Sequence, residues 1–151
     1  MKINQFGISL LAIFLLSTTA MAGNDFNSTP AVQGYDVVSY QNAKRPVRGN
    51  GNFVAEYNGA VYLFSNKENQ KMFSNNPERY APAYGGFCAY GISLRKKFIG
   101  DPEVWRVTKN KLYLNLDTNI QAQWLKDVPG HIKTANTQWK KVRNKSYASL
   151  Q

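Results

Sequence analysis

Two side chains suited to nucleophilic or metal chemistry each occur once in this chain of 151 residues: Cys88 and His131. A thiol beside an imidazole can act as an activated nucleophile, and both groups bind soft or borderline metal ions. The two residues lie far apart in the sequence, which leaves open whether they meet. The alternatives are a buried cysteine that serves as a small hydrophobe and a histidine that is hydrogen-bonded at the start of a helix.

The segment around Cys88 is the best candidate for a binding site. Two adjacent glycines allow close backbone approach or positive φ, and three aromatic side chains can form the walls of a pocket. A reactive thiol requires a partly exposed, electropositive environment, which the basic run at 95–97 could provide. We therefore expect Cys88 to be partly buried and to line a pocket. The predicted pocket residues are Tyr84, Gly85, Gly86, Phe87, Cys88, Tyr90 and Asp36, and the candidate metal ligands are Cys88 and His131.

Asp36 belongs to this set because it precedes the apolar pair Val37-Val38. Its alternative role is that of a turn or capping residue. The other acidic residues are few, and no pair of them has a spacing typical of acid–base catalysis.

The motifs of several common enzyme and metal-binding classes are absent from the sequence. It holds no Gly-rich phosphate loop, no Gly-x-Ser-x-Gly elbow, no Cys-x-x-Cys and no His-x-x-x-His. Each of these patterns has a specific mechanical reason for its spacing. Their absence favours a non-enzymatic protein, and the sequence leaves its cofactors unknown.

The N-terminus has the three parts of a secretory signal peptide. Lys2 supplies the positive charge, residues 6–16 are almost wholly apolar, and Ala20-Met21-Ala22 matches the A-x-A cleavage pattern. A membrane-spanning helix needs about 20 apolar residues, and this run is shorter. We expect residues 1–22 to be cleaved, the protein to be periplasmic or secreted, and no transmembrane segment to remain after cleavage.

The formal net charge is +10, and the basic excess lies mostly in the second half of the chain, at 95–97 and 140–145. This charge favours contact with anionic surfaces, for which a cell envelope offers lipids and polymers. Nucleic acid is not expected as a partner of an exported protein. The alternative is that each basic run is only the solvated face of a helix.

Two β-hairpins are predicted to carry these residues. The first spans about 53–64 around Asn58-Gly59, the strongest short hairpin signal, and the second spans about 104–116 around Lys109-Asn110. Apolar residues at three- and four-residue steps predict an amphipathic helix at about 132–142. The elements together predict an α+β domain in which antiparallel hairpins form a sheet with short helices packed on it.

Capping signals locate two further helices. Ser65 and Thr118 each begin a capping-box pattern, which predicts helix starts at these positions. We expect one domain at 32–143, preceded by a loose leader at 23–31 and followed by a polar, frayed tail at 144–151. No internal repeat is predicted, because the two hairpins with their helices differ in length and motif.

Several motifs resemble those of the YHS domain family. Three of them lie at 34–40, 61–65 and 73–80. Later stretches at 84–89, 100–105, 111–115 and 129–132 are similar to those of the longer, exported YHS-domain proteins of bacteria. The resemblance covers about 32–142, which is nearly the whole predicted mature chain.

The resemblance implies a binding module, because short YHS domains are associated with heavy-metal transport and sensing and are similar to small cysteine-rich metal-binding modules. Where those modules carry thiolates, this chain has Ser39, Ser65 and Asn69. Soft metal ions prefer thiolate ligands, so the resemblance implies the frame of the family without its usual ligands.

We therefore expect an exported, non-enzymatic YHS-like module that binds a metal ion or a small molecule. One alternative is a thiol-dependent enzyme or redox protein that uses Cys88. The other is a basic protein that interacts with the envelope through its charge.

Overall fold

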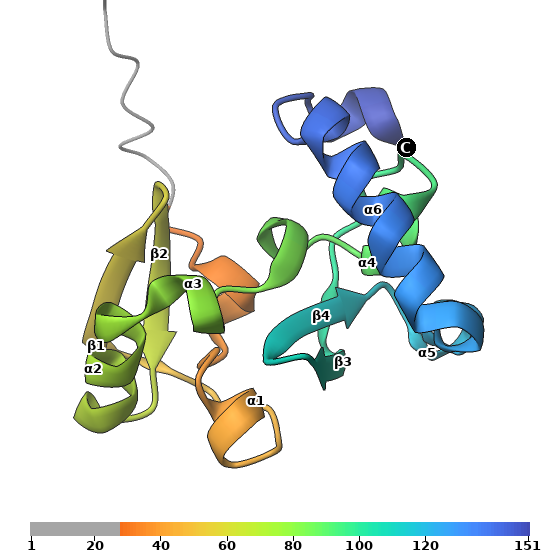
Figure 1. The fold of residues 1–151 in the computed structure, drawn as a ribbon. Helices are drawn as coiled ribbons and strands as arrows, with labels where there is room; N and C mark the ends of the chain where they lie inside the picture. The colour runs from red at the N-terminus through yellow and green to blue at the C-terminus, as the bar shows by residue number, and fades with distance from the viewer. Residues whose placement is uncertain (1–27) are drawn as a thin grey trace, which may run out of the picture.

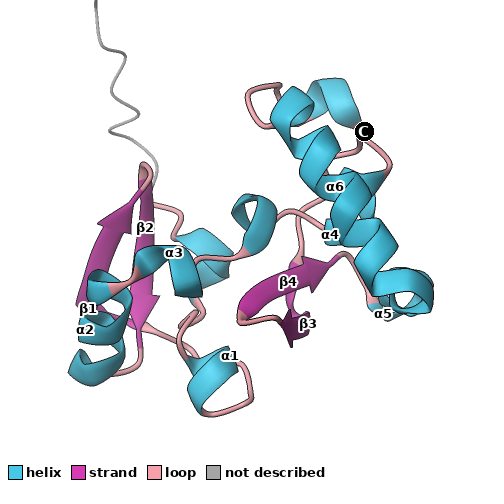
Figure 2. Cartoon of the chain, in the orientation of Figure 1, coloured by secondary structure: helices cyan, strands magenta, loops and turns pink. Residues whose placement is uncertain are grey.

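Two antiparallel β-hairpins form the framework of the computed structural model, which describes residues 28–151 (Figures 1 and 2). The first hairpin pairs β1 (Asn50–Tyr57) with β2 (Ala60–Phe64), and the second pairs β3 (Asp101–Thr108) with β4 (Lys111–Asn115). The predicted signal peptide and most of the predicted leader lie outside the described residues. The prediction of an α+β domain is confirmed, with the hairpins as two separate two-stranded sheets.

Both hairpins turn at the predicted residues. Asn58 and Gly59 have φ of 51° and 74°, the left-handed values that a two-residue hairpin turn requires. Lys109 and Asn110 make the second turn with φ of 49° and 57°. The turn residues thus fix the register next to each turn. Farther along, the register shifts between Asn50 and Val54 in the first pair and between Asp101 and Trp105 in the second.

Short helices surround each hairpin in the same order, and residues 31–80 and 83–142 are called the first and second halves below. The first half contains η1 (Ala31–Gly34), α1 (Ser39–Asn42), α2 (Lys67–Asn75) and α3 (Pro77–Tyr80). The second half contains η2 (Ala83–Gly86), α4 (Ala89–Ser93), α5 (Thr118–Trp124), η3 (Leu125–Asp127) and α6 (Val128–Val142). A last turn, η4 (Ala148–Leu150), ends the chain.

The helix after each hairpin is capped one residue away from the predicted position. Asn66 caps α2 and Asp117 caps α5, and each side chain accepts a 2.8 Å hydrogen bond from the backbone N–H three residues later. The predicted caps, Ser65 and Thr118, are therefore wrong. Short Asn and Asp side chains are strong N-caps, and Ser65 is instead part of the buried hydrogen-bond cluster described below.

The chain repeats one arrangement twice, so the prediction of no internal repeat is wrong. Both halves run from a left-handed turn through a short helix to an eight-residue strand, a five-residue strand and a capped helix. The glycine that ends each turn accepts a hydrogen bond from the glycine just before the hairpin: Gly34 from Gly49 at 2.9 Å, and Gly86 from Gly100 at 3.1 Å. The repeat is hidden in the sequence because most equivalent positions hold different residues.

Strand β4 is shared by the two hydrophobic cores. Successive side chains of a strand point to opposite faces, and the last four residues of β4 are buried. Leu112 and Leu114 pack into the core of the first half, whereas Tyr113 packs into that of the second. The Tyr40 hydroxyl adds a direct link by donating to the backbone oxygen of Pro102 at 3.0 Å. These contacts join the halves into one domain.

The C-terminal tail folds back on the loop after α4 and does not fray as expected (Figure 1). The backbone N–H of Lys97 donates to Leu150 at 2.9 Å, and the side-chain amide of Gln151 donates to the Lys97 carbonyl at 2.6 Å. The Lys97 ammonium donates to the carbonyls of Arg143 at 2.9 Å and Lys145 at 2.6 Å. Lys97 therefore satisfies backbone carbonyls of the chain just after α6.

Candidate functional site

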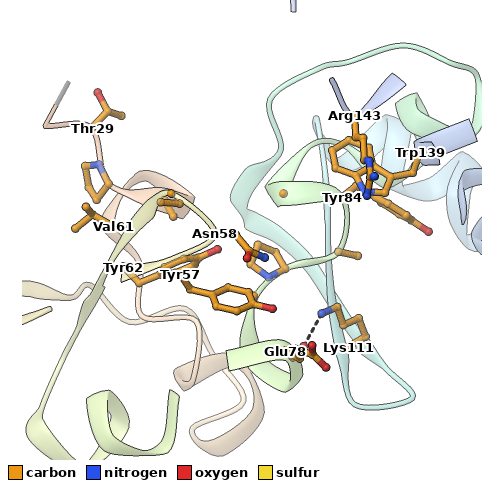
Figure 3. Close-up of a pocket in the computed structure, with 18 of the residues that line it drawn as sticks. Thr29, Tyr57, Asn58, Val61, Tyr62, Glu78, Tyr84, Lys111, Trp139 and Arg143 are labelled. Carbon is orange, nitrogen blue, oxygen red and sulfur yellow. Dashed lines mark hydrogen bonds between the residues drawn. The ribbon is translucent and has the colours of Figure 1, made fainter. Parts of the chain in front are cut away.

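A cleft of about 940 Å³ lies between the two halves (Figure 3). The first half contributes the turn of its hairpin and the strand ends beside it. The second half contributes η2 and the start of β4, and the end of α6 closes one side. A cleft of this volume can enclose much of a small organic molecule.

The hairpin of the first half forms one wall of the cleft. Tyr57 and Asn58, at the end of β1 and in the turn, point into the cleft (Figure 3). Tyr62 on β2 lies beside them, and its ring packs 4.7 Å from the ring of Phe73 in the core. Because the wall is continuous with the core, its aromatic surface is held in place without a ligand.

The opposite wall is made by η2 and α6. The Tyr84 hydroxyl donates to Oδ1 of Asn136 at 2.9 Å, and the ring of Tyr84 meets that of Trp139 at 5.9 Å, edge to face. Burial raises the pKa of Tyr84, so its hydroxyl stays protonated and can keep donating. Gly85 completes the wall with φ of +63°, which suits a residue without a Cβ. These contacts fix the two aromatic rings relative to each other.

Two cations and one acidic side chain line the same cleft. Lys111 donates to the backbone oxygen of Glu78 at 2.7 Å (Figure 3). Burial lowers the pKa of Lys111, and the Glu78 carboxylate opposes that shift. Arg143 lines the cleft at the end of α6, beside Trp139 (Figure 3), and its side chain is exposed. Aromatic faces can stack on a ring, and an ammonium and a guanidinium can bind an anionic group.

Only part of the predicted pocket lines this cleft. Tyr84 and Gly85 do, whereas the other predicted residues lie elsewhere. Cys88 is 0 % exposed, so the expectation of a partly buried thiol that lines a pocket is wrong. The predicted residues that are not among the lining of the cleft are Gly86, Phe87, Cys88, Tyr90 and Asp36.

The Cys88 thiol is a structural group at the start of α4. Its sulfur accepts from the N–H of Gly91 at 3.3 Å and lies 3.8 Å from Oδ1 of Asn115, to which the thiol donates. Burial raises the pKa of Cys88, which disfavours the nucleophilic thiolate. The basic run at 95–97 does not lower the pKa of this thiol, and the Lys97 ammonium instead donates to backbone carbonyls just after α6.

Asp36 forms a buried polar cluster with Ser65 and Asn69. Its Oδ1 accepts from the N–H of Val38 at 2.9 Å. Its Oδ2 accepts from the N–H of Ser65 at 2.9 Å, the Ser65 hydroxyl at 2.7 Å and the Asn69 amide at 2.7 Å. The Ser39 hydroxyl donates to the Asp36 carbonyl at 2.7 Å. The carboxylate ties the start of the first half to the β2–α2 junction, and its donors come from the protein itself.

Ser39, Ser65 and Asn69 therefore all hydrogen-bond to Asp36, Ser39 to its backbone carbonyl and the other two to its carboxylate. Asp36 and Cys88 also occupy equivalent places, each two residues after the glycine that ends a left-handed turn. The N–H of Asp36 donates to Val47 and that of Cys88 to Phe98, both at 2.8 Å. The two halves thus use a carboxylate and a thiol at the same place in the fold.

His131 and Cys88 have different partners. The His131 ring lies against Tyr90, with ring centroids 5.0 Å apart and an edge-to-face angle of 78°, whereas the thiol faces Asn115. Within residues 28–151 no group of three or more His, Cys, Asp or Glu side chains is arranged to hold a metal ion. No hydrogen bond or ring contact thus joins the two predicted metal ligands, Cys88 and His131.

Most of the cleft was not anticipated from sequence. Lys111, Trp139 and Arg143 share no motif and meet only because α6 packs beside β4 and η2. The signal available in the sequence was local: the aromatic residues Tyr57 and Tyr62 lie on either side of the Asn58-Gly59 turn.

No helix within residues 28–151 combines the length and the apolar character of a membrane span. No family model, curated protein or solved structure matches the chain.

Proposed function

We propose that this chain is an exported, non-enzymatic, YHS-like binding protein that takes a small molecule with a ring and an anionic group in the cleft between its halves. The observation that carries the proposal is the lining: aromatic side chains from both halves face a common space that also holds Lys111 and Arg143. The resemblance of the sequence to YHS domains supports a binding role.

The aromatic walls favour a ligand with a planar or sugar ring. Tyr57 and Tyr62 belong to one half, and Tyr84 and Trp139 to the other. A ring bound against either wall would contact aromatic side chains, and aromatic contacts of this type add about 0.5–1.5 kcal/mol beyond area burial. Both walls are anchored in the cores, so binding needs little ordering of side chains.

The charges favour an anionic group on that ligand. Lys111 is half-buried beside the cleft and has one hydrogen bond to a backbone oxygen, which leaves further N–H groups of its ammonium to donate. Arg143 supplies a planar fork suited to carboxylate or phosphate. The Glu78 carboxylate offsets one of the two positive charges, so the cleft favours a ligand with a small negative charge.

A thiol-dependent reaction is not favoured by this geometry. Cys88 is buried outside the cleft, and its pKa is raised by burial. The cleft lining contains neither Cys88 nor His131. We therefore place the function in binding and not in thiol chemistry.

The proposal is tested by NMR titration with three probes: phenyl phosphate, which has both ring and charge, benzyl alcohol, which has only the ring, and inorganic phosphate. We expect phenyl phosphate to give saturable shifts at the amides of 57–62 and 83–85 and at the indole of Trp139. The other two probes should bind at least about tenfold more weakly, since each lacks one part of the recognition.

Matched variants separate the cleft from general charge. Lys111→Gln and Arg143→Gln should each weaken phenyl phosphate binding about tenfold, whereas Lys133→Gln, on an exposed face of α6 outside the lining, should leave it unchanged. Equal losses in all three variants, or shifts scattered over the surface without saturation, would overturn the proposal.

A further inference from the structure

The structure gathers the two basic runs of the sequence at one end of the molecule. Lys97 in the loop after α4 donates through its ammonium to the carbonyls of Arg143 and Lys145. Gln151 in the tail donates through one amide nitrogen to the carbonyls of both Lys97 and Tyr147, at 2.6 and 3.1 Å. Residues 95–97 and the end of α6 with its tail are therefore direct neighbours.

The two segments that meet at this end contain no acidic side chain. Residues 94–99 and 139–151 contain no Asp or Glu, and together they contain seven Lys or Arg residues. Arg95 and Lys96 are exposed in the loop, as are Lys140 and Lys141 in the last turn of α6. Cations in a last turn also complement the helix dipole, but that effect accounts for α6 alone and not for the loop beside it.

Large apolar side chains are exposed among these cations. Leu94, which directly precedes Arg95, is 56 % exposed, and Tyr147 in the tail is 45 % exposed. The shared hydrogen bonds of Gln151 place the tail against the loop, so the two side chains belong to the same end. The basic end is defined here as Leu94, Arg95, Lys96, Lys140, Lys141, Lys145 and Tyr147.

We propose that the basic end docks on the surface of a bilayer that contains anionic phospholipid. Cations attract the headgroups, and exposed leucine and tyrosine side chains can enter the boundary between headgroups and acyl chains. A polyanion in solution would use the cations alone, because it offers no apolar layer for Leu94 and Tyr147. The combination of both side-chain types therefore favours a lipid surface.

The proposal is independent of the cleft. None of the residues of the basic end lines it, and Arg143, which does, is excluded from the definition. The residues that would contact the membrane are therefore different from those that line the cleft. The two sites adjoin, because Arg143 and Asn144 of the cleft lining lie between Lys141 and Lys145 of the basic end.

Flotation with vesicles tests this docking. The full exported chain should float with vesicles of phosphatidylglycerol and phosphatidylcholine and not with phosphatidylcholine alone, and added salt should weaken the binding. Lys140→Gln/Lys141→Gln should lower the partition coefficient about 25-fold, since each cation near an anionic surface contributes about fivefold. Lys67→Gln/Lys71→Gln, the same charge change on exposed α2 positions, is the matched control and should have little effect.

The apolar part is tested separately. Leu94→Ser/Tyr147→Ser should weaken vesicle binding while leaving binding to heparin, a soluble polyanion, unchanged. Leu125→Ser, at another exposed leucine, should change neither. Thermal unfolding of each variant shows that loss of binding is not loss of fold. Equal losses in the α2 control, or vesicle binding that is indifferent to Leu94 and Tyr147, would overturn the proposal in favour of general charge attraction.

Discussion

Removing the Asp36 carboxylate should be among the most damaging single changes in the first half. Asp36 is 0 % exposed, and its two oxygens accept hydrogen bonds from two backbone N–H groups and two side chains. The perturbation of choice is Asp36→Ala, which deletes all four acceptor contacts without adding bulk. Asp36→Asn, which keeps the shape but replaces one oxygen by a donor, provides a graded second step.

The expected loss of stability depends on whether each hydrogen-bond donor finds a new partner once the Asp36 carboxylate is removed. The N–H groups of Val38 and Ser65 belong to the main chain and lose their partner in place, at about 1–3 kcal/mol each. The Ser65 hydroxyl and the Asn69 amide are half-buried and can turn to water. Asp36→Ala also removes the unfavourable free energy of burying a carboxylate, and this offsets part of the lost stability. We expect Asp36→Ala to lower the free energy of unfolding by about 3–4 kcal/mol, a large share of the 5–15 kcal/mol typical of a domain.

Urea unfolding followed by circular dichroism measures this difference, with an unchanged m-value as the sign that both states keep their compactness. Asp127→Ala is the matched control, because Asp127 is an exposed carboxylate that accepts a single 3.0 Å bond from Gly130 at the start of α6. Loss of such a cap costs about 1 kcal/mol. Asp36→Asn should fall between the two variants.

A loss for Asp36→Ala no greater than that for Asp127→Ala would refute the reasoning. It would mean that the donors around Asp36 find water readily, and that the cluster does not tie the start of the first half to α2. If Asp36→Ala is too unstable to purify, Asp36→Asn is compared with Asp127→Ala instead, because its unfolding midpoint is expected to remain measurable.

Two further predictions use the core of the second half. The Cys88 thiol should resist alkylation in the folded protein and react on unfolding. Its raised pKa keeps the thiol protonated in the folded state, whereas in the unfolded chain the thiol ionises near its ordinary pKa of 9.0. The free energy of unfolding should therefore fall as pH rises above about 9, by at most about 1.4 kcal/mol per pH unit from this group. In urea titrations between pH 8 and 10, Cys88→Ala should lack this part of the pH dependence. Rapid labelling of Cys88 in the native protein would contradict the prediction. Gly100→Ala should lower the free energy of unfolding by more than about 2 kcal/mol, because a Cβ there would lie 2.6 Å from both the Gly86 oxygen and the Leu114 Cβ. Gly51→Ala, where a Cβ would have nothing within 4 Å, should be close to neutral. Equal melting temperatures for the two variants would contradict this prediction.

Local interactions made much of the fold readable in advance. The Asn58-Gly59 turn needs only its own positive φ and the alternating residues beside it, and it forms where the sequence predicted. The buried face of α6, with Ala135 and Val142, follows from the helical repeat alone. Cap positions were missed by one residue, because several neighbouring polar side chains can serve as a cap and tertiary contacts choose among them.

The candidate site was predicted only in part for a different reason. Sequence singled out Tyr84 and Gly85 through the glycine pair and the aromatics around it, and both line the cleft. It also singled out Cys88, whose burial depends on Asn115 and on packing against β4, residues that no local pattern connects to it. Residue type marks what a side chain can do, but its surroundings decide its pKa and access.

The sequence by itself determined the elements: two hairpins with their turns, an amphipathic last helix, and a strongly basic second half. Tertiary structure alone decided that the halves repeat one arrangement, that β4 serves both cores, and that a cleft opens between them. The physical reason is range. Turns, caps and helical faces depend on residues a few positions apart, whereas the Asp36 cluster, the cleft and the basic end are made by residues that meet only when distant segments pack together.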